Sequence, residues 1–297
     1  MEKEVNRNYK DTSFRSLFSE KNKENLLSLY NAIRHTHYAD VNELEITTLD
    51  DVIYLSVKND VSILIDGCLS LWEHQSTWNP NMPIRGFEYF AQLYDIYIKT
   101  HKLDIYSSKL LKLPTPQYIV FYNGEKDIPP ITKLRLSDAF MDSSVHSEFE
   151  WTATVYNINL GKNDDSLDAC PALKGYMTLI FRIRENLKYG MELKPSVRKA
   201  IAECKKDGIL TDWLSKEGVE TMLIEDFTLE KYQDLKAEEE KRDKQEIAFW
   251  KEKYYHEVSK NASRTKDANK SRLSKLMSKL FEKKIAKTFY DSKNDIY

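Results

Sequence analysis

The sequence predicts an α/β core followed by a helical C-terminal part. Strand-like apolar runs occur between Leu44 and Tyr122 and again from Phe149 to Leu160, with segments of helical spacing before and between them. From Ala172 onward the apolar spacing is helical throughout. A chain of 297 residues suffices for one large domain or a medium one with appendages.

The N-terminal third predicts a helix and then a set of strands. Residues 11–34 carry apolar side chains at helical spacing, with capping residues at positions 11–13. Residues 44–49 alternate and predict a strand that continues at residues 52–57. The runs 61–65 and 68–72 flank Asp66-Gly67, which is a strong signal for a two-residue hairpin turn.

The later elements alternate between helix and strand. Prolines 80 and 83 suit the start of a helix whose apolar stripe runs through residues 87–98. The run 118–122, between Pro116 and Asn123-Gly124, is typical of a central strand covered on both faces. Residues 149–160 predict another strand, and helices follow over residues 173–187 and 197–204, with Gly208 as a C-terminal cap.

Composition bounds the class of protein. Charged residues are 31% and apolar residues 41%, which is typical of a soluble globular protein. No apolar run is long enough for a membrane span, and the first residues have no apolar h-region, so we expect no secretory signal. The three cysteines (Cys68, Cys170 and Cys204) are far apart and odd in number, so we expect a reducing, cytoplasmic location rather than disulfides or a zinc cluster.

A polar triplet, Glu73-His74-Gln75, ends the second arm of the hairpin. On a strand Glu73 and Gln75 project to one face and His74 to the other. Burying the Glu73 and Gln75 side chains away from water is costly unless a polar neighbour, or a metal ion and a substrate, interacts with them. Asp60 opens the other arm, so Asp60, Glu73 and Gln75 are expected to converge at one end of the sheet. Two carboxylates there suit Mg²⁺, or Mn²⁺ in its place, as expected for hydrolysis of a phosphodiester.

These residues resemble a known family. Asp60, Glu73 and Gln75 across a β-hairpin, behind one helix and before another, resemble the PD-(D/E)XK nuclease superfamily. More closely, EHQS followed by NPNMPIR, the preceding KND, and the later YIVFYNG and LSDAF resemble the recombination-promoting nuclease/putative transposase family. The resemblance covers roughly residues 10–215.

The resemblance implies a restriction-endonuclease-like mixed sheet flanked by helices. Together with the helical spacing and charge of the C-terminal part, it predicts a nuclease domain at residues 1–190, a helical region at 191–228 and a charged helical tail at 229–297. It also implies a metal-dependent DNA endonuclease linked to recombination or transposition, with Asp60 and Glu73 as metal ligands. Gln75 stands where the superfamily more often has Lys. A Lys at this position would stabilise developing negative charge and orient the attacking water, whereas Gln brings no charge. The alternative is a catalytically silent DNA-binding or assembly protein that keeps the fold.

Several other residues are candidates for the same site. Asp66 competes as a ligand, although a hairpin tip demands such a residue, and Asp51 replaces Asp60 if the strand register differs. Glu24 on the first helix adds a ligand or is simply solvated, and the same holds for Glu20. Arg85 either pairs with a phosphate or is an ordinary arginine at a helix start. His74 is expected to be packed rather than to act as a general base.

The last part of the chain is basic. From residue 259 to 297 there are eleven Lys or Arg and four acidic residues, although the whole chain has a net charge of −2. Apolar residues from Leu273 to Ile285 fall on one helical stripe. The stripe suggests packing or a homodimer, the basic face suggests DNA, and an anionic membrane surface is a third alternative. The residues expected to contact DNA are Lys275, Lys279, Lys283 and Lys284.

Overall fold

The computed structural model describes residues 12–47, 61–142, 145 and 147–261. The chain divides into two compact units, residues 1–234 and residues 235–297. The first unit contains the sheet and all of the candidate site residues that are described. In the second unit, the described residues continue the long helix α8 (Val219–Asn261).

A six-stranded mixed sheet forms the centre of the first unit. Its spatial order is β1-β2-β3-β4-β6-β5. Neighbours β1, β2 and β3 are antiparallel, β3, β4 and β6 run parallel to one another, and β5 is antiparallel to β6. The strands are β1 (Glu45–Ile46), β2 (Val61–Ile65), β3 (Cys68–Gln75), β4 (Thr115–Tyr122), β5 (Ile131–Arg135) and β6 (Thr152–Asn157).

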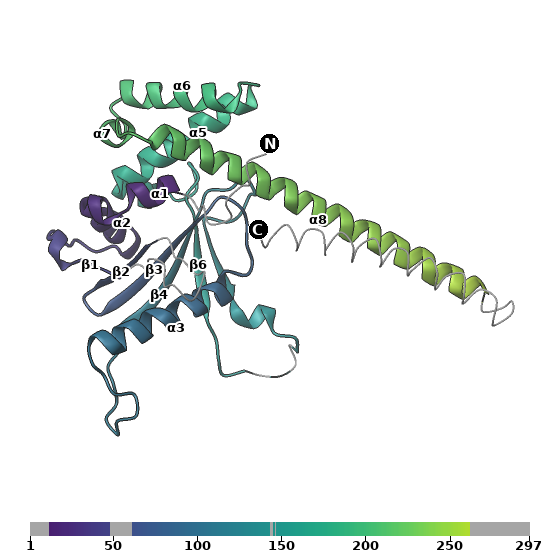
Figure 1. Ribbon diagram of the computed structural model, residues 1–297, viewed down its shortest axis with the longest axis horizontal. Helices are drawn as coiled ribbons and strands as arrows, with labels where there is room; N and C mark the ends of the chain where they lie inside the picture. Colours follow the sequence, from purple (N-terminus) through teal and green to yellow (C-terminus); the bar gives the residue numbers. More distant parts are fainter. Residues whose placement is uncertain (1–11, 48–60, 143–144, 146, 262–297) are drawn as a thin grey trace, which may run out of the picture. The chain divides into compact units, whose positions relative to one another are not determined.

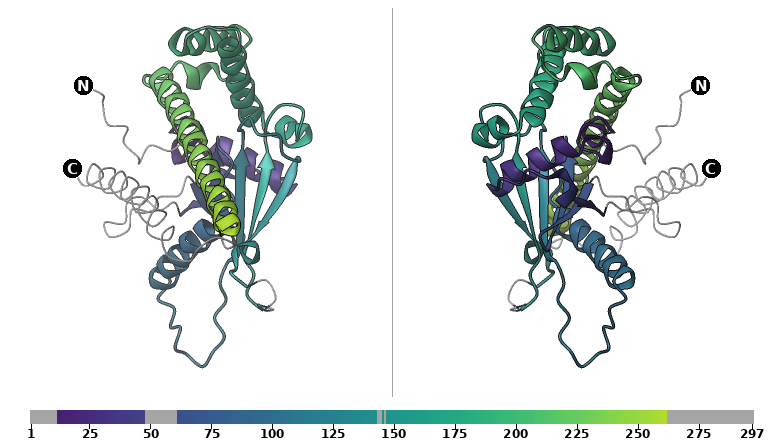
Figure 2. Two further views of the ribbon diagram at one scale, coloured as in Figure 1. Left: turned by 90° about the vertical axis from the view of Figure 1, so that its right-hand side faces the viewer. Right: turned by 90° about the vertical axis from the view of Figure 1, so that its left-hand side faces the viewer.

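Helices cover both faces of this sheet, which confirms the predicted α/β class (Figure 1). Helix α3 (Met82–Thr100) packs on one face, while α1 (Thr12–Leu17), α2 (Lys23–Arg34) and α5 (Pro171–Lys188) pack on the other. Figure 2 shows the two layers from the sides. The remaining helical segments are η1 (Glu20–Asn22), η2 (Val41–Glu43), η3 (Leu136–Ala139), α4 (Asp164–Ala169), α6 (Leu193–Lys206) and α7 (Thr211–Leu214).

The predicted first helix is in fact two. Ser19 has an extended backbone (φ −123°, ψ 171°) between α1 and η1. The side chain of Asn22 donates to the carbonyl of Ser16 at 2.8 Å, and such local bonds offer the backbone an alternative to continuing the helix. Apolar spacing alone therefore did not reveal the break.

The hairpin turn is where the sequence predicted it. Ile65 pairs with Cys68, which leaves Asp66 and Gly67 as a two-residue loop with φ of +46° and +69°. Positive φ at both positions is what a tight turn between twisted strands requires, and Asp and Gly tolerate it. The hydroxyl of Tyr38 donates to the Asp66 carboxylate at 3.1 Å.

The alternation of β3 divides its side chains between two cores. Leu69 and Leu71 pack under α3, whereas Trp72 packs beneath the helices of the opposite face. Because side chains alternate along a strand, Glu73 and Gln75 belong to the α3 face and His74 to the other.

Helix α3 comes unusually close to the sheet at Gly86. A Cβ built at this position would lie 2.3 Å from ring carbons of Tyr118 on β4. Glycine at this position therefore lets the first turns of α3, which include Arg85, lie directly on the strands.

We expect Gly86→Ala to destabilise the protein by about 1–3 kcal/mol, because the added methyl group overpacks against a buried ring. Urea unfolding followed by circular dichroism measures this. Glu88→Ala, an exposed position on the same helix, is the control and should stay within about 0.5 kcal/mol of the parent. Equal stability of Gly86→Ala and the parent would contradict the close packing.

Candidate functional site

The carboxyl ends of the three parallel strands form one edge of the sheet. Gln75 pairs with Tyr122 near the ends of β3 and β4, and Tyr122 pairs with Asn157 at the end of β6. Glu73 lies two residues before the end of β3 and is fully buried. In open α/β sheets this edge is where ligands most often bind.

Arg85 forms an ion pair with Glu73. Its Nη2 lies 2.8 Å from Oε2 of Glu73 and donates to the hydroxyl of Tyr89 at 3.2 Å. Arg85 and Tyr89 are four residues apart on α3, so they occupy the same helix face. The Arg85 side chain is 23% exposed, whereas that of Glu73 is 0% exposed. The carboxylate of the pair is therefore buried, while the guanidinium reaches solvent at the edge of the sheet.

Electrostatics keeps Arg85 charged. Burial acts to lower the pKa of the guanidinium, but the charge of Glu73 and the contact with Tyr89 outweigh it and raise the pKa above its usual value. Glu73 therefore has a permanent positive partner. Arg85 was expected either to pair with a phosphate or to be an ordinary residue at a helix start, and its contact with Glu73 was not foreseen.

Gln75 lies at the end of β3, on the face that Glu73 occupies, and is half-buried. Its Nε2 donates to the backbone carbonyl of His74 at 2.9 Å. This bond holds the amide next to the strand. The side-chain carbonyl oxygen of Gln75 is the part of the residue that can act as an acceptor toward water or a metal ion.

His74 is packed on the opposite face, as predicted. Its ring stacks on Phe14 at 4.6 Å between centroids with an interplanar angle of 14°, and it meets Tyr176 edge-on at 5.8 Å. The side chain is 1% exposed. The sheet separates this ring from the Glu73 carboxylate, so His74 contributes to packing at this position.

The remaining candidates are distributed differently. Asp66 occupies the hairpin tip, seven residues from Glu73 and roughly 23 Å away along an extended strand, so the structure does not bring the two together. Glu24 on α2 lines a separate cavity of about 670 Å³ with His35, His37 and Tyr38, and α2 packs on the face opposite Glu73, so the structure does not bring Glu24 to Glu73. Asp51, Asp60 and the four tail lysines, with the predicted tail helix, lie outside the described residues.

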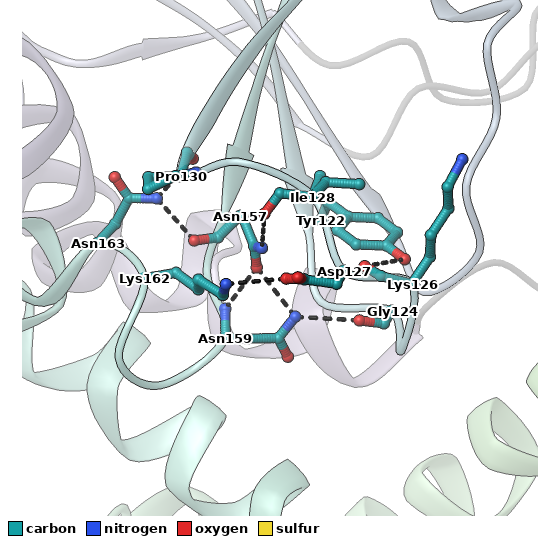
Figure 3. A network of polar contacts seen from close by, with 10 residues as sticks. All are labelled: Tyr122, Gly124, Lys126, Asp127, Ile128, Pro130, Asn157, Asn159, Lys162 and Asn163. Carbon is teal, nitrogen blue, oxygen red and sulfur yellow. Dashed lines mark hydrogen bonds and ion pairs between the residues drawn. The ribbon is translucent and has the colours of Figure 1, made fainter.

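A network of asparagines fixes the loops at the same edge (Figure 3). Asn157 donates to the carbonyl of Ile128 at 2.9 Å, and its side-chain oxygen accepts from Asn159. Asn159 also donates to the carbonyl of Gly124 at 3.0 Å, and Lys162 pairs with Asp127 at 2.8 Å. Sequence analysis missed this network, although several Asn residues closely follow a strand in the segment NINLGKN.

Arg184 of α5 supports the end of β4 from the other face. It donates to the carbonyl of Asn123 and forms an ion pair with Glu230 of α8 at 2.7 Å. Both charged side chains are mostly buried, at 17% and 14% exposure. The edge is thus held from both sides by residues distant in sequence.

One expected oxygen donor for Mg²⁺, Glu73, is described at this edge. A buried carboxylate is the hard oxygen donor that Mg²⁺ prefers, so the described part of the site fits one such ligand. Within the described residues, no group of three or more His, Cys, Asp or Glu side chains lies close enough to hold a metal ion. The second predicted ligand, Asp60, is outside that part of the chain.

Comparison with known proteins identifies no relative. No family model matches the chain, and no curated protein or solved structure shows a significant match to it. Among the helices described, each is too short or too polar to cross a bilayer.

We expect Glu73 and Arg85 to be energetically coupled. Arg85→Met alone should destabilise the protein by about 3–5 kcal/mol, because it leaves a buried carboxylate without its cation. The double variant Glu73→Gln/Arg85→Met should be more stable than the sum of the single effects predicts. Urea unfolding of all four proteins gives the coupling free energy.

Arg198→Met is the matched control, since Arg198 pairs with Glu220 on an exposed surface. Its effect should stay below about 1 kcal/mol. Additive effects of the two substitutions at Glu73 and Arg85 would show that the pair is not coupled.

Proposed function

We propose that this protein is a metal-dependent DNA endonuclease of the PD-(D/E)XK type, linked to recombination or transposition. One observation carries the proposal: a fully buried Glu73 precedes Gln75 by two residues on a central strand and faces the same side of a mixed sheet. In the superfamily that the sequence resembles, these two positions hold an acidic residue and a polar residue. The order of helix, three strands, helix and strand from α2 to β4 agrees with it.

The proposed metal ligands are Glu73 and Asp60, with Mg²⁺ or Mn²⁺ as the ion. Val61 pairs with Trp72 in the hairpin. Asp60 directly precedes this arm of the hairpin in the sequence, so we propose that it supplies the second carboxylate beside Glu73. A bound ion would lower the pKa of a water molecule and neutralise charge on the phosphodiester.

The other residues of the site bind and orient. The Gln75 carbonyl oxygen accepts a hydrogen bond from the attacking water, and it brings no charge in place of the Lys that is more common there. Arg85 is partly exposed beside Glu73, so its remaining N–H groups can donate to a non-bridging phosphate oxygen. Burial of the site lowers the local dielectric and strengthens both interactions.

A second candidate is a DNA-binding or assembly protein without catalytic activity. Gln75 in place of Lys favours it, as does the ion pair that already satisfies one oxygen of Glu73. The basic segment at residues 259–297 would then supply most of the affinity for DNA.

The purified protein should nick or linearise supercoiled plasmid DNA with Mg²⁺ or Mn²⁺ and should be inactive with EDTA. Asp60→Ala and Glu73→Gln should each abolish cleavage, because either change removes a carboxylate ligand. Agarose gel electrophoresis measures the products, and circular dichroism shows whether each variant is folded.

Glu88→Gln serves as the matched control and should cleave like the parent, since Glu88 is exposed on α3. Activity that persists unchanged in Glu73→Gln would indicate a contaminating nuclease. Absence of cleavage with every metal, together with DNA binding, would favour the silent candidate.

Removal of residues 259–297 should separate DNA contact from subunit contact. If the lysines neutralise phosphates, truncation weakens DNA binding and reduces the slope of log K against log salt by roughly 0.9 per lost contact. If the stripe from Leu273 to Ile285 joins two subunits, light scattering should instead show a dimer becoming a monomer. No change in mass or slope would contradict both roles.

A further inference from the structure

A lysine and a tryptophan meet at the rim of the same edge of the sheet. Trp78 lies in the loop between β3 and α3, and Lys126 lies in the loop after β4. The Nζ of Lys126 is 4.9 Å from the centre of the Trp78 ring. The ring also meets Tyr122 edge-on, at 5.8 Å and 87°. Tyr122 pairs with Gln75 at the end of β3, so the Tyr122 ring connects the Trp78 indole to the end of this strand.

Both loops are held firmly. The N–H of Asn123 donates to the carbonyl of Gln75 at 3.1 Å, which extends the pairing of the two strands into the loops. A Cβ at Gly124 would lie 2.2 Å from the carbonyl of Ser76, so the loops touch there. The Tyr122 hydroxyl donates to the carbonyl of Lys126 at 3.2 Å. The backbone that presents the Lys126 side chain is therefore positioned by the fold.

The Lys126 side chain itself is exposed and leads away from the asparagine network (Figure 3). The neighbouring Asp127 is already paired with Lys162. Trp78 is half-buried and packs partly against the core under α3, so only part of its surface is accessible. The rim thus presents an aromatic surface with an exposed cation above it.

We propose that Trp78 and Lys126 bind an unpaired nucleotide of the DNA substrate, with the base stacked on the indole and the adjacent phosphate contacted by the lysine. This inference rests on the proposed function and assigns its substrate class: DNA that is single-stranded or locally unpaired beside the site. Base stacking on aromatic side chains is the main sequence-independent interaction of single strands. In a duplex the faces of the bases are hidden in the stack, so the indole discriminates between the two forms.

The contact of Lys126 with the ring is compatible with this role. At an exposed site a cation–π contact is weaker than the stacking of a base on an aromatic side chain. A base can therefore take the place of the ammonium group on the ring. The flexible lysine then moves to the phosphate, which it contacts as a point charge.

The test is binding of a fluorescein-labelled oligothymidylate to the full chain in EDTA, measured by fluorescence anisotropy at several salt concentrations. Trp78→Ala should raise Kd on the order of tenfold and leave the salt slope unchanged. Lys126→Ala should weaken binding and reduce the slope by about 0.7. Trp78→Phe should retain most of the affinity because it keeps an aromatic face, and it guards against a folding defect in Trp78→Ala.

Trp250→Ala is the matched control, since Lys253 lies 5.0 Å from the Trp250 ring centre on α8. It should bind like the parent. An equal loss in this variant, an unchanged Kd in folded Trp78→Ala, or equally tight binding of a duplex by the parent would each overturn the proposal. The measurement contains no metal, so loss of binding in Trp78→Ala supports the contact even in a protein that does not cleave. If Trp78→Ala binds the oligonucleotide like the parent and the protein still cleaves DNA, the proposed Trp78 contact is wrong and the proposed nuclease function is unaffected.

Discussion

Burial of a single carboxylate constrains much of this fold. Glu73 is withdrawn from water on a central strand, and a buried charge is tolerated only with a partner of opposite sign. That partner, Arg85, is supplied by the first turns of α3. The helix must therefore begin near the end of β3 and lie close to the sheet, which the missing side chain at Gly86 permits. The Glu73–Arg85 ion pair, the position of α3 on the sheet and the glycine at position 86 therefore depend on one another.

The parallel strands β3, β4 and β6 extend this arrangement into a surface. Because they point the same way, their following loops emerge together, and polar side chains hold the loops after β4 and β6. Asn157 and Asn159 hold the loop after β4 from one side, and Arg184 holds the start of that loop from the other. The Asn157 side chain is buried and hydrogen-bonded, which specifies loop geometry more narrowly than apolar contacts would.

Local features of the chain were predictable because their causes are local. The hairpin follows from the conformational freedom of Asp66-Gly67, and the opposite placement of Glu73 and His74 follows from strand alternation. The partner of Glu73 was not predictable, since no pattern reveals which cation crosses from helix to strand. Strand β5 was missed because only Ile131 and Leu134 of its five residues are apolar, and their spacing of three does not alternate as a strand should. The asparagine network depends on loops meeting in space.

The Glu73–Arg85 pair also distinguishes the two functional candidates on physical grounds. In a protein without catalytic activity the pair is complete in itself, and replacing both residues by apolar ones of similar volume should cost little stability. In a nuclease the carboxylate must exchange its cation for a metal ion, and Arg85 must remain nearby for the phosphate. The partial exposure of Arg85 beside a fully buried Glu73 is compatible with this second role, because a guanidinium that reaches solvent can also reach a phosphate. The two candidates therefore differ in what a metal ion would do to the pair: it stays closed in the first and must open in the second.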